Sequence, residues 1–199
     1  MKIIITEETY KLLLENDEFK RNISEDAKRI ESLPSDTGLF IQNLNNGYEL
    51  VLYSSEEDKV YGIIGVRNFK TNDYFVSYVA AEQGFGVYMY ELAMMLLSKE
   101  DAGLMPDRSG EIKPKAWNIW KRFYHERGDV YKTPATKTNV SDKKQFEDEE
   151  DAKVFNSVYY MEKSSDFNKL VQNAKLKNKS EIERIFQLAD DYNAEKYIY

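Results

Sequence analysis

The chain contains no cysteine and only one histidine, His125, among its 199 residues. The absence of cysteine excludes disulfides, zinc–thiolate centres and a cysteine nucleophile, and with a single histidine we expect no metal centre. Long hydrophobic runs are also missing. The apolar residues that open the chain give way to Glu7 and Glu8, so this run is too short for a signal peptide or a membrane span. We therefore expect a cytoplasmic protein without a membrane partner.

Basic residues are in the minority. There are 28 Lys and Arg against 35 Asp and Glu, and the resulting net charge of −7 disfavours nucleic acid as a partner. Hydrophobic residues nevertheless make up 42% of the chain, which is enough for a substantial core. These proportions indicate a globular protein of one main domain with room for a small appendage.

Turn residues, capping residues and apolar periodicity predict a mixed α/β order of elements. The expected helices cover residues 6–16, 24–33, 87–97, 114–127, 166–175 and 181–193. The expected strands cover residues 38–44, 48–53, 60–69, 74–79, 103–105 and 154–161, and residues 131–140 are expected to form a loop. Three of the strands, 48–53, 60–69 and 74–79, follow one another closely and should form a meander.

The last expected helix has an apolar stripe and a capping box. Ser180 and Glu183 have the spacing of the box, in which each side chain caps the other's backbone N–H. The stripe consists of Ile182, Ile185, Phe186, Leu188 and Ala189. We expect it to pack either on the body of the protein or against a second copy in a homodimer.

A glycine turn follows the expected strand 74–79. Gly84 and Gly86 lie directly before a helix whose only charged residue between Val87 and Leu97 is Glu91. Glycines let a backbone approach an anion closely, and the first N–H groups of a helix point toward one. The arrangement is typical of a phosphate-binding turn, although such a glycine pair also occurs in ordinary strand-to-helix turns. A helix with so few polar positions is expected to be buried.

A second candidate region begins where the expected strand 103–105 ends. Asp107, Arg108 and Ser109 follow that strand, and loops at strand ends often carry function in α/β proteins. The helix after them has an aromatic face that includes Trp117, Trp120, Phe123 and Tyr124, and His125 falls on the opposite, water-facing side. An ordinary surface turn explains the polar residues equally well.

Two segments resemble motifs of the GNAT (Gcn5-related N-acetyltransferase) superfamily. The segment Gln83-Gly84-Phe85-Gly86 is similar to its acyl-CoA pyrophosphate turn, and Tyr124 followed by Gly128 is similar to its late motif. The order of elements over residues 1–130 resembles the GNAT fold. Residues 84–90 and 103–110, with the Pro-x-Ala-x-x-x-Trp helix, are similar to a GNAT-like family common in bacteriophage genomes.

The resemblance implies a mixed sheet flanked by helices and an acyl-CoA cofactor, most simply acetyl-CoA, whose acyl group is transferred to an amine. It implies that Tyr124 protonates the departing thiolate. Asp107 and Ser109 are catalytic candidates, and Arg108 and Trp117 are candidates for substrate binding. The positions implied for the cofactor are Tyr78, Val79, Ala80, Gln83, Gly84, Phe85, Gly86, Val87 and Tyr88. We expect residues 1–163 to form the GNAT-like acyltransferase domain and residues 164–199 a helical extension packed on it.

The sequence departs from the GNAT pattern at three places. Ala81 stands where Gln or Arg is usual, the segment 74–81 has no carboxylate, and Asp129 follows Gly128 where phenylalanine is usual. The missing carboxylate and the long acidic extension favour a second hypothesis, a catalytically inactive GNAT-like scaffold that binds and blocks a host protein such as a defence factor. A third hypothesis is acyl modification of a nucleobase amine on DNA, which the acidic charge disfavours. A phage protein would act in the cytoplasm of its bacterial host.

Overall fold

The computed structural model describes residues 32–68, 73–98, 101–107, 112–135 and 148–197. The helix expected over 6–16 and all but the last two residues of that expected over 24–33 lie outside these ranges, as do Arg108 and Ser109. All the elements described below belong to one unit of the chain, Pro34–Tyr199. No helix in the described part of the chain is both long enough and apolar enough to span a membrane.

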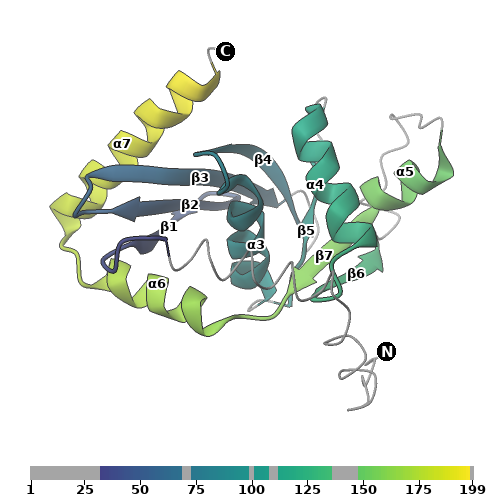
Figure 1. Cartoon of the computed structure of the whole chain (residues 1–199), viewed down its shortest axis with the longest axis horizontal. Coiled ribbons are helices and arrows are strands. Elements are labelled where there is room, and N and C mark those ends of the chain that lie inside the picture. Colours follow the sequence, from purple (N-terminus) through teal and green to yellow (C-terminus); the bar gives the residue numbers. More distant parts are fainter. Residues whose placement is uncertain (1–31, 69–72, 99–100, 108–111, 136–147, 198–199) are drawn as a thin grey trace. The chain divides into compact units, whose positions relative to one another are not determined.

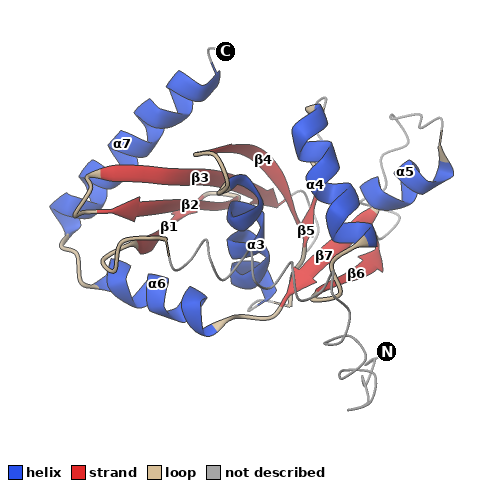
Figure 2. Ribbon diagram, viewed as in Figure 1, coloured by secondary structure: helices blue, strands red, loops and turns tan. Residues whose placement is uncertain are grey.

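The described residues form a mixed seven-stranded sheet with five helices, which confirms the expected α/β class (Figures 1 and 2). The strand order is β1-β2-β3-β4-β5-β7-β6. The strands are β1 (Gly38–Leu44), β2 (Gly47–Ser54), β3 (Lys59–Asn68), β4 (Tyr74–Ala81), β5 (Leu104–Met105), β6 (Val130–Pro134) and β7 (Ser157–Met161). The helices are α3 (Gly86–Leu97), α4 (Pro114–His125), α5 (Glu149–Phe155), α6 (Ser165–Lys175) and α7 (Lys179–Tyr197).

Strands β1 to β4 form an antiparallel meander, which contains the three-strand meander that the sequence predicts for β2, β3 and β4. Asn45 and Asn46 connect β1 to β2 in a two-residue hairpin, a connection in which asparagine is favoured. Gly62 and Ile63 of β3 show which helix packs on each face of the sheet. A Cβ added at Gly62 would meet the side chain of Met89 in α3, whereas Ile63 packs in the cluster that contains α7. Successive strand residues face opposite sides, so α3 and α7 cover opposite faces of the sheet.

The apolar stripe of α7 packs on the body of the protein, which confirms the first of the two expected modes. Ile185 and Ala189 are buried in a cluster with Phe40 of β1 and Ala174 of α6. Ile182, Phe186 and Leu188 are partly buried against the same cluster. The polar ends of the helix add further contacts, because Arg184 pairs with Asp58 at 2.6 Å and the Tyr192 hydroxyl donates to Glu82 at 3.1 Å.

Three local expectations are wrong. Residues 130–134 form β6, although residues 131–140 were expected to form a loop. The Lys and Thr residues of this segment give no clear local strand pattern, and the strand forms because its backbone pairs with β7. The expected strand 154–161 is split, since Val154 and Phe155 end α5 and only Ser157–Met161 is strand. The capping box of α7 uses Asn178 and Glu181 rather than Ser180 and Glu183. The helix therefore begins at Lys179, two residues before its expected start at residue 181.

Candidate functional site

Strands β4 and β5 stay together over only two residue pairs. They are parallel, and Tyr74 pairs with Leu104 and Phe75 with Met105. Strand β4 carries an irregularity at this point, because Gly65 pairs with Tyr78 while Val66 pairs with Val76, which leaves Ser77 as an extra residue. Such a bulge bends a strand and increases its twist. Beyond Phe75, no described strand pairs with this edge of β4, and the sheet opens there.

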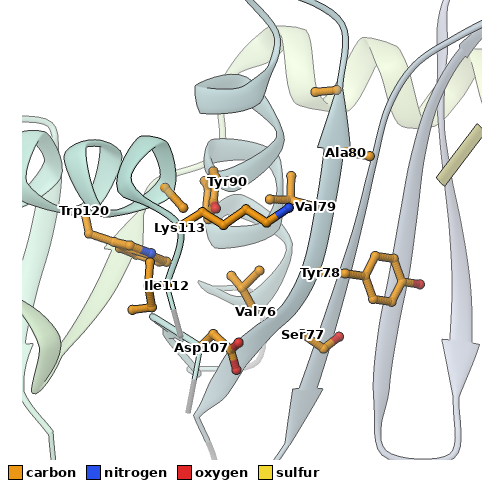
Figure 3. A pocket seen from close by; sticks show the side chains of 12 residues that line it. Val76, Ser77, Tyr78, Val79, Ala80, Tyr90, Asp107, Ile112, Lys113 and Trp120 are labelled. Atoms are coloured by element: carbon orange, nitrogen blue, oxygen red, sulfur yellow. The ribbon is translucent and has the colours of Figure 1, made fainter. Parts of the chain in front are cut away.

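A cavity of about 370 Å³ occupies the opening (Figure 3). One wall is the edge of β4, and the other contains Tyr90 of α3 and Trp120 of α4. The lining residues are Val76, Ser77, Tyr78, Val79, Ala80, Ala81, Tyr90, Asp107, Ile112, Lys113, Ala116 and Trp120. The predicted cofactor positions Tyr78, Val79 and Ala80 are thus all at the cavity. Along this edge, backbone N–H and C=O groups face a space large enough for an extended ligand.

The glycine turn continues directly from β4. The Phe85 N–H donates to the Glu82 carbonyl oxygen at 3.0 Å, and Gly84 has a φ of +93°. This is the geometry of a type II turn, in which only residues without a Cβ are comfortable at the third position. A Cβ added at Gly84 or at Gly86 would meet no atom within 4 Å. Among the described residues, the space beside these two positions is therefore open.

Helix α3 presents an uncapped N-terminus at the end of this turn. Its N-cap residue, Phe85, makes no side-chain capping hydrogen bond, and its first turn has no acidic residue. The N–H groups of Gly86 and Val87 have no carbonyl acceptor within the helix. Together with the positive end of the helix dipole they favour an anion. The open turn and the exposed strand edge fit a cofactor with a pyrophosphate and an extended amide-containing arm, as coenzyme A has.

Two charged side chains belong to the cavity. Asp107, two residues after the end of β5, is the one carboxylate among the described lining residues, and Lys113, directly before α4, is the one ammonium. Figure 3 shows the Lys113 side chain extending from the start of α4 toward β4. Sequence reasoning selected Asp107 but missed Lys113. The sequence feature that could have pointed to Lys113 is its position immediately before Pro114, at the start of an aromatic helix.

Two predicted residues of α4 do not line the cavity. The Tyr124 ring lies under the Lys132 ammonium, whose nitrogen is 4.7 Å from the ring centroid, and Lys132 also donates to the Tyr124 carbonyl oxygen. Burial lowers the pKa of Lys132. Trp117 has the Lys121 ammonium 5.6 Å from its ring centroid. Trp120 takes the place at the cavity wall, where its ring also contacts Tyr90 edge-on.

A buried ion pair supports the helix that carries the glycine turn. Arg127 donates to Glu91 of α3 at 2.6 Å and makes two further hydrogen bonds to Asp129, at 2.7 and 2.6 Å. Its guanidinium thus links α3 to the connection between α4 and β6. Sequence reasoning did not identify this pair, although a lone Glu91 in an otherwise uncharged helix was a signal. Asp129, noted as a departure from the GNAT pattern, is the second partner of the arginine.

A second buried carboxylate, Glu49 of β2, accepts a hydrogen bond from Tyr78 of β4. The Tyr78 ring covers Gly65, where an added Cβ would come within 2.3 Å of it, and its hydroxyl donates to Glu49 of β2. Burial raises the pKa of Glu49, the Tyr78 hydrogen bond lowers it, and the negative charge of Asp190 raises it, with a net upward shift. Burial and the Glu49 carboxylate also raise the pKa of Tyr78. This pair holds β4 in place next to its bulge.

The chain matches no protein-family model, no curated protein sequence and no solved structure. Within the described ranges, no group of three or more histidine and acidic side chains has a geometry suited to a metal ion. The candidate site consists of an open strand edge, a glycine turn, a helix N-terminus and a cavity lined by Asp107 and Lys113.

Proposed function

We propose that the protein is an acyl-CoA-dependent N-acyltransferase with a GNAT-like fold. The observation that carries the proposal is the separation of β4 from β5, which opens a cavity of about 370 Å³ along a strand edge leading straight to the glycine turn. Few ligands need a pyrophosphate site and an extended amide-binding edge in one line, and acyl-CoA is one. The resemblance of residues 83–86 and 124–128 to GNAT motifs supports the same function. Bacteriophage origin and action in the bacterial cytoplasm belong to this proposal.

Acyl-CoA supplies a thioester whose carbonyl carbon is open to attack by an amine. The N–H groups of Gly86 and Val87 hold the pyrophosphate, and the edge of β4 from Tyr78 to Ala80 orients the arm that carries the thioester. Such positioning accounts for much of the rate of an acyl transfer. In this proposal Asp107, which lines the cavity, accepts the proton that the acceptor amine loses. The GNAT resemblance assigns the proton for the departing thiolate to Tyr124, which is not among the residues that line the cavity, and the Tyr124→Phe variant tests that assignment.

The second candidate function is an inactive acyl-CoA-binding or empty scaffold that blocks a host protein. One observation favours it: the described residues that line the cavity include a single carboxylate, Asp107, and none on β4. The two candidates differ in one measurable property, because only the enzyme turns over acyl-CoA with an amine acceptor. Release of CoA in the presence of a panel of amines therefore separates them.

Calorimetry with acetyl-CoA tests the cofactor site. Gly86→Glu places bulk and negative charge where the pyrophosphate is proposed to lie, and we expect it to abolish binding. Gly86→Ala adds only a methyl group in open space and should keep most of the affinity. Asn168→Glu adds the same charge on the exposed face of α6 and serves as the matched control.

Binding by the unmutated protein that Gly86→Glu abolishes and Asn168→Glu preserves would support the proposal. No heat from the unmutated protein at acetyl-CoA concentrations up to about 1 mM would contradict it, since that limit already corresponds to weak binding. Equal binding by the Gly86→Glu variant would move the cofactor away from the glycine turn.

A further inference from the structure

Glu82 is the first residue of the glycine turn and carries a carboxylate next to the proposed pyrophosphate site. Its N–H donates to the Tyr61 carbonyl oxygen at 2.9 Å, and its own carbonyl oxygen accepts from the Phe85 N–H at 3.0 Å. The backbone of Glu82 is thus fixed by β3 and by the turn. The two end residues of such a turn have Cα atoms within about 7 Å of each other, so a glutamate side chain at the first position can turn toward the start of α3.

The Glu82 side chain lies on the other face of the sheet, toward α7. Ala80 is buried in the cluster that contains residues of α7. Ala81 faces the α3 side, where a Cβ added at Gly62 would come within 3.3 Å of it. Because successive strand residues alternate between faces, Glu82 points to the same side as Ala80. Tyr192 of α7 packs against that cluster, and its hydroxyl donates to the Glu82 carboxylate at 3.1 Å.

The Tyr192 hydroxyl is suited to hold a carboxylate in one position. Its ring is partly buried against the cluster, so the hydroxyl is presented by a packed side chain. Burial raises the pKa of Tyr192, and the hydrogen bond to Glu82 raises it further. The hydroxyl therefore keeps its proton and acts as a donor to the carboxylate.

We propose that Tyr192 and Glu82 are positioning residues, in which the tyrosine holds the carboxylate on the α7 face and thereby keeps the glycine turn open for the pyrophosphate of acyl-CoA. This inference rests on the proposed function, because the anion at the turn is that of the proposed cofactor. A released Glu82 carboxylate is attracted by the positive end of the α3 dipole and competes with the pyrophosphate for the N–H groups of Gly86 and Val87. At a greater distance it still repels the negative cofactor. Helix α7 thus sets the affinity of the turn from the opposite face of the sheet.

Calorimetry with acetyl-CoA tests the inference. Tyr192→Phe keeps the ring and removes the hydroxyl, and we expect the affinity to fall at least about 5-fold at low salt. Glu82→Gln removes the charge and should bind at least as tightly as the unmutated protein. The double variant Tyr192→Phe/Glu82→Gln should regain the affinity of the unmutated protein, because no carboxylate is left to release. Tyr53→Phe is the matched control, since its hydroxyl donates to Asp58, between β2 and β3, and its loss should leave the affinity unchanged.

Two further measurements separate positioning from packing. The effect of a released carboxylate is electrostatic and is screened by salt, so the affinity ratio of the unmutated protein to Tyr192→Phe should approach one at about 0.5 M salt. A packing defect would give a ratio that does not depend on salt. Urea unfolding of each variant shows whether the tyrosine ring still packs, and we expect similar free energies of unfolding for Tyr192→Phe and the double variant.

The outcomes separate this inference from the proposed function. Acetyl-CoA binding that Gly86→Glu abolishes but Tyr192→Phe leaves unchanged overturns the inference and leaves the cofactor site standing. A loss in Tyr192→Phe that persists in the double variant also overturns it, as does weaker binding by Glu82→Gln. No binding by the unmutated protein overturns both proposals. A loss in Tyr192→Phe that the second substitution restores and that Tyr53→Phe does not show supports the inference.

Discussion

The guanidinium of Arg127 donates a hydrogen bond of 2.6 Å to the carboxylate of Glu91, and each side chain is only 3% exposed. Buried charges are tolerated only when they are paired, because each loses its hydration on folding. Glu91 lies on α3, the helix whose N-terminus ends the glycine turn. The pair therefore links the stability of the fold to the position of the candidate cofactor site.

Removing the arginine should be costly. Arg127→Met leaves the Glu91 carboxylate buried with one partner fewer, and the free energy of unfolding should fall by about 3–5 kcal/mol in urea titrations. Arg184→Met removes an exposed arginine that also pairs with an aspartate at 2.6 Å and should change the stability little. The double variant Glu91→Leu/Arg127→Met should recover part of the loss. If the two arginine variants lost the same free energy of unfolding, burial would not determine how much an ion pair contributes to stability.

The two glycines of the turn should respond differently to alanine. Gly84 has a φ of +93°, so Gly84→Ala should destabilise the protein by about 1–2 kcal/mol through backbone strain. Gly86 occupies the first position of α3 without a positive φ, and Gly86→Ala should be neutral or stabilising by up to about 1 kcal/mol. Thermal unfolding of the two variants provides the comparison. Identical effects would mean that the turn adopts another conformation in solution.

Packing of α7 on the sheet can be tested at one side chain. Ile185 is 1% exposed, and Ile185→Ala should lower the free energy of unfolding by about 2–5 kcal/mol because it leaves a cavity. Leu176 is 83% exposed, and Leu176→Ala should stay within about 0.5 kcal/mol of the unmutated protein. Urea unfolding measures both. A small effect at Ile185 would contradict the packing of α7 on this face.

Glu49 should make stability depend on pH. Its pKa is raised above the ordinary value of 4.5, so the folded state holds the proton more tightly than the unfolded chain does. The stabilisation from the protonated carboxyl is fully present below about pH 4.5 and is lost as the pH rises through the raised pKa. Glu49→Gln cannot lose a proton, so its stability relative to the unmutated protein should increase over this range.

Urea titrations at a series of pH values measure this difference, and Glu162→Gln, at an exposed position, controls for the loss of a carboxylate. Tyr78 and Asp190 are the neighbouring groups that also act on Glu49. If the free energies of unfolding of the Glu49→Gln variant and the unmutated protein differed by the same amount at every pH, the upward shift of the Glu49 pKa would be contradicted.

Asp107 and Tyr124 can be separated by kinetics. CoA release is followed with acetyl-CoA and polyamines, lysine peptides, aminoglycosides or DNA as acceptors. Asp107→Asn should lower acyl transfer by about 10²–10⁴-fold with little change in acetyl-CoA affinity, as expected for loss of a proton acceptor. Asp101→Asn makes the same change outside the cavity and should have no effect. Tyr124→Phe removes only a hydroxyl, and a similar loss there would establish its role as general acid, whereas full activity would exclude it.

Much of the local structure follows from the sequence. Gly38–Leu44 has the strand bounds that alternation and turn residues predict, and Gly84 is required by a turn that the sequence already marks. The burial of α3 follows from its composition. These features depend on neighbours a few residues away, and short-range sterics, capping and periodicity are visible in a linear chain.

The cavity and its contents depend on tertiary structure. The sequence of β4 does not show that Ser77 is an extra residue in its pairing, because a bulge is defined only against the partner strand. Residues 130–134 likewise become strand only by pairing with β7. The resemblance to a GNAT motif assigned Tyr124 a role in the mechanism. The fold sets its ring against Lys132 and brings Lys113 and Asp107 to the cavity. Apart from β6, local propensities largely determine which elements form. The packing of α4 against β7 and α3 decides which side chains from distant segments meet, because those contacts exist only in the folded chain.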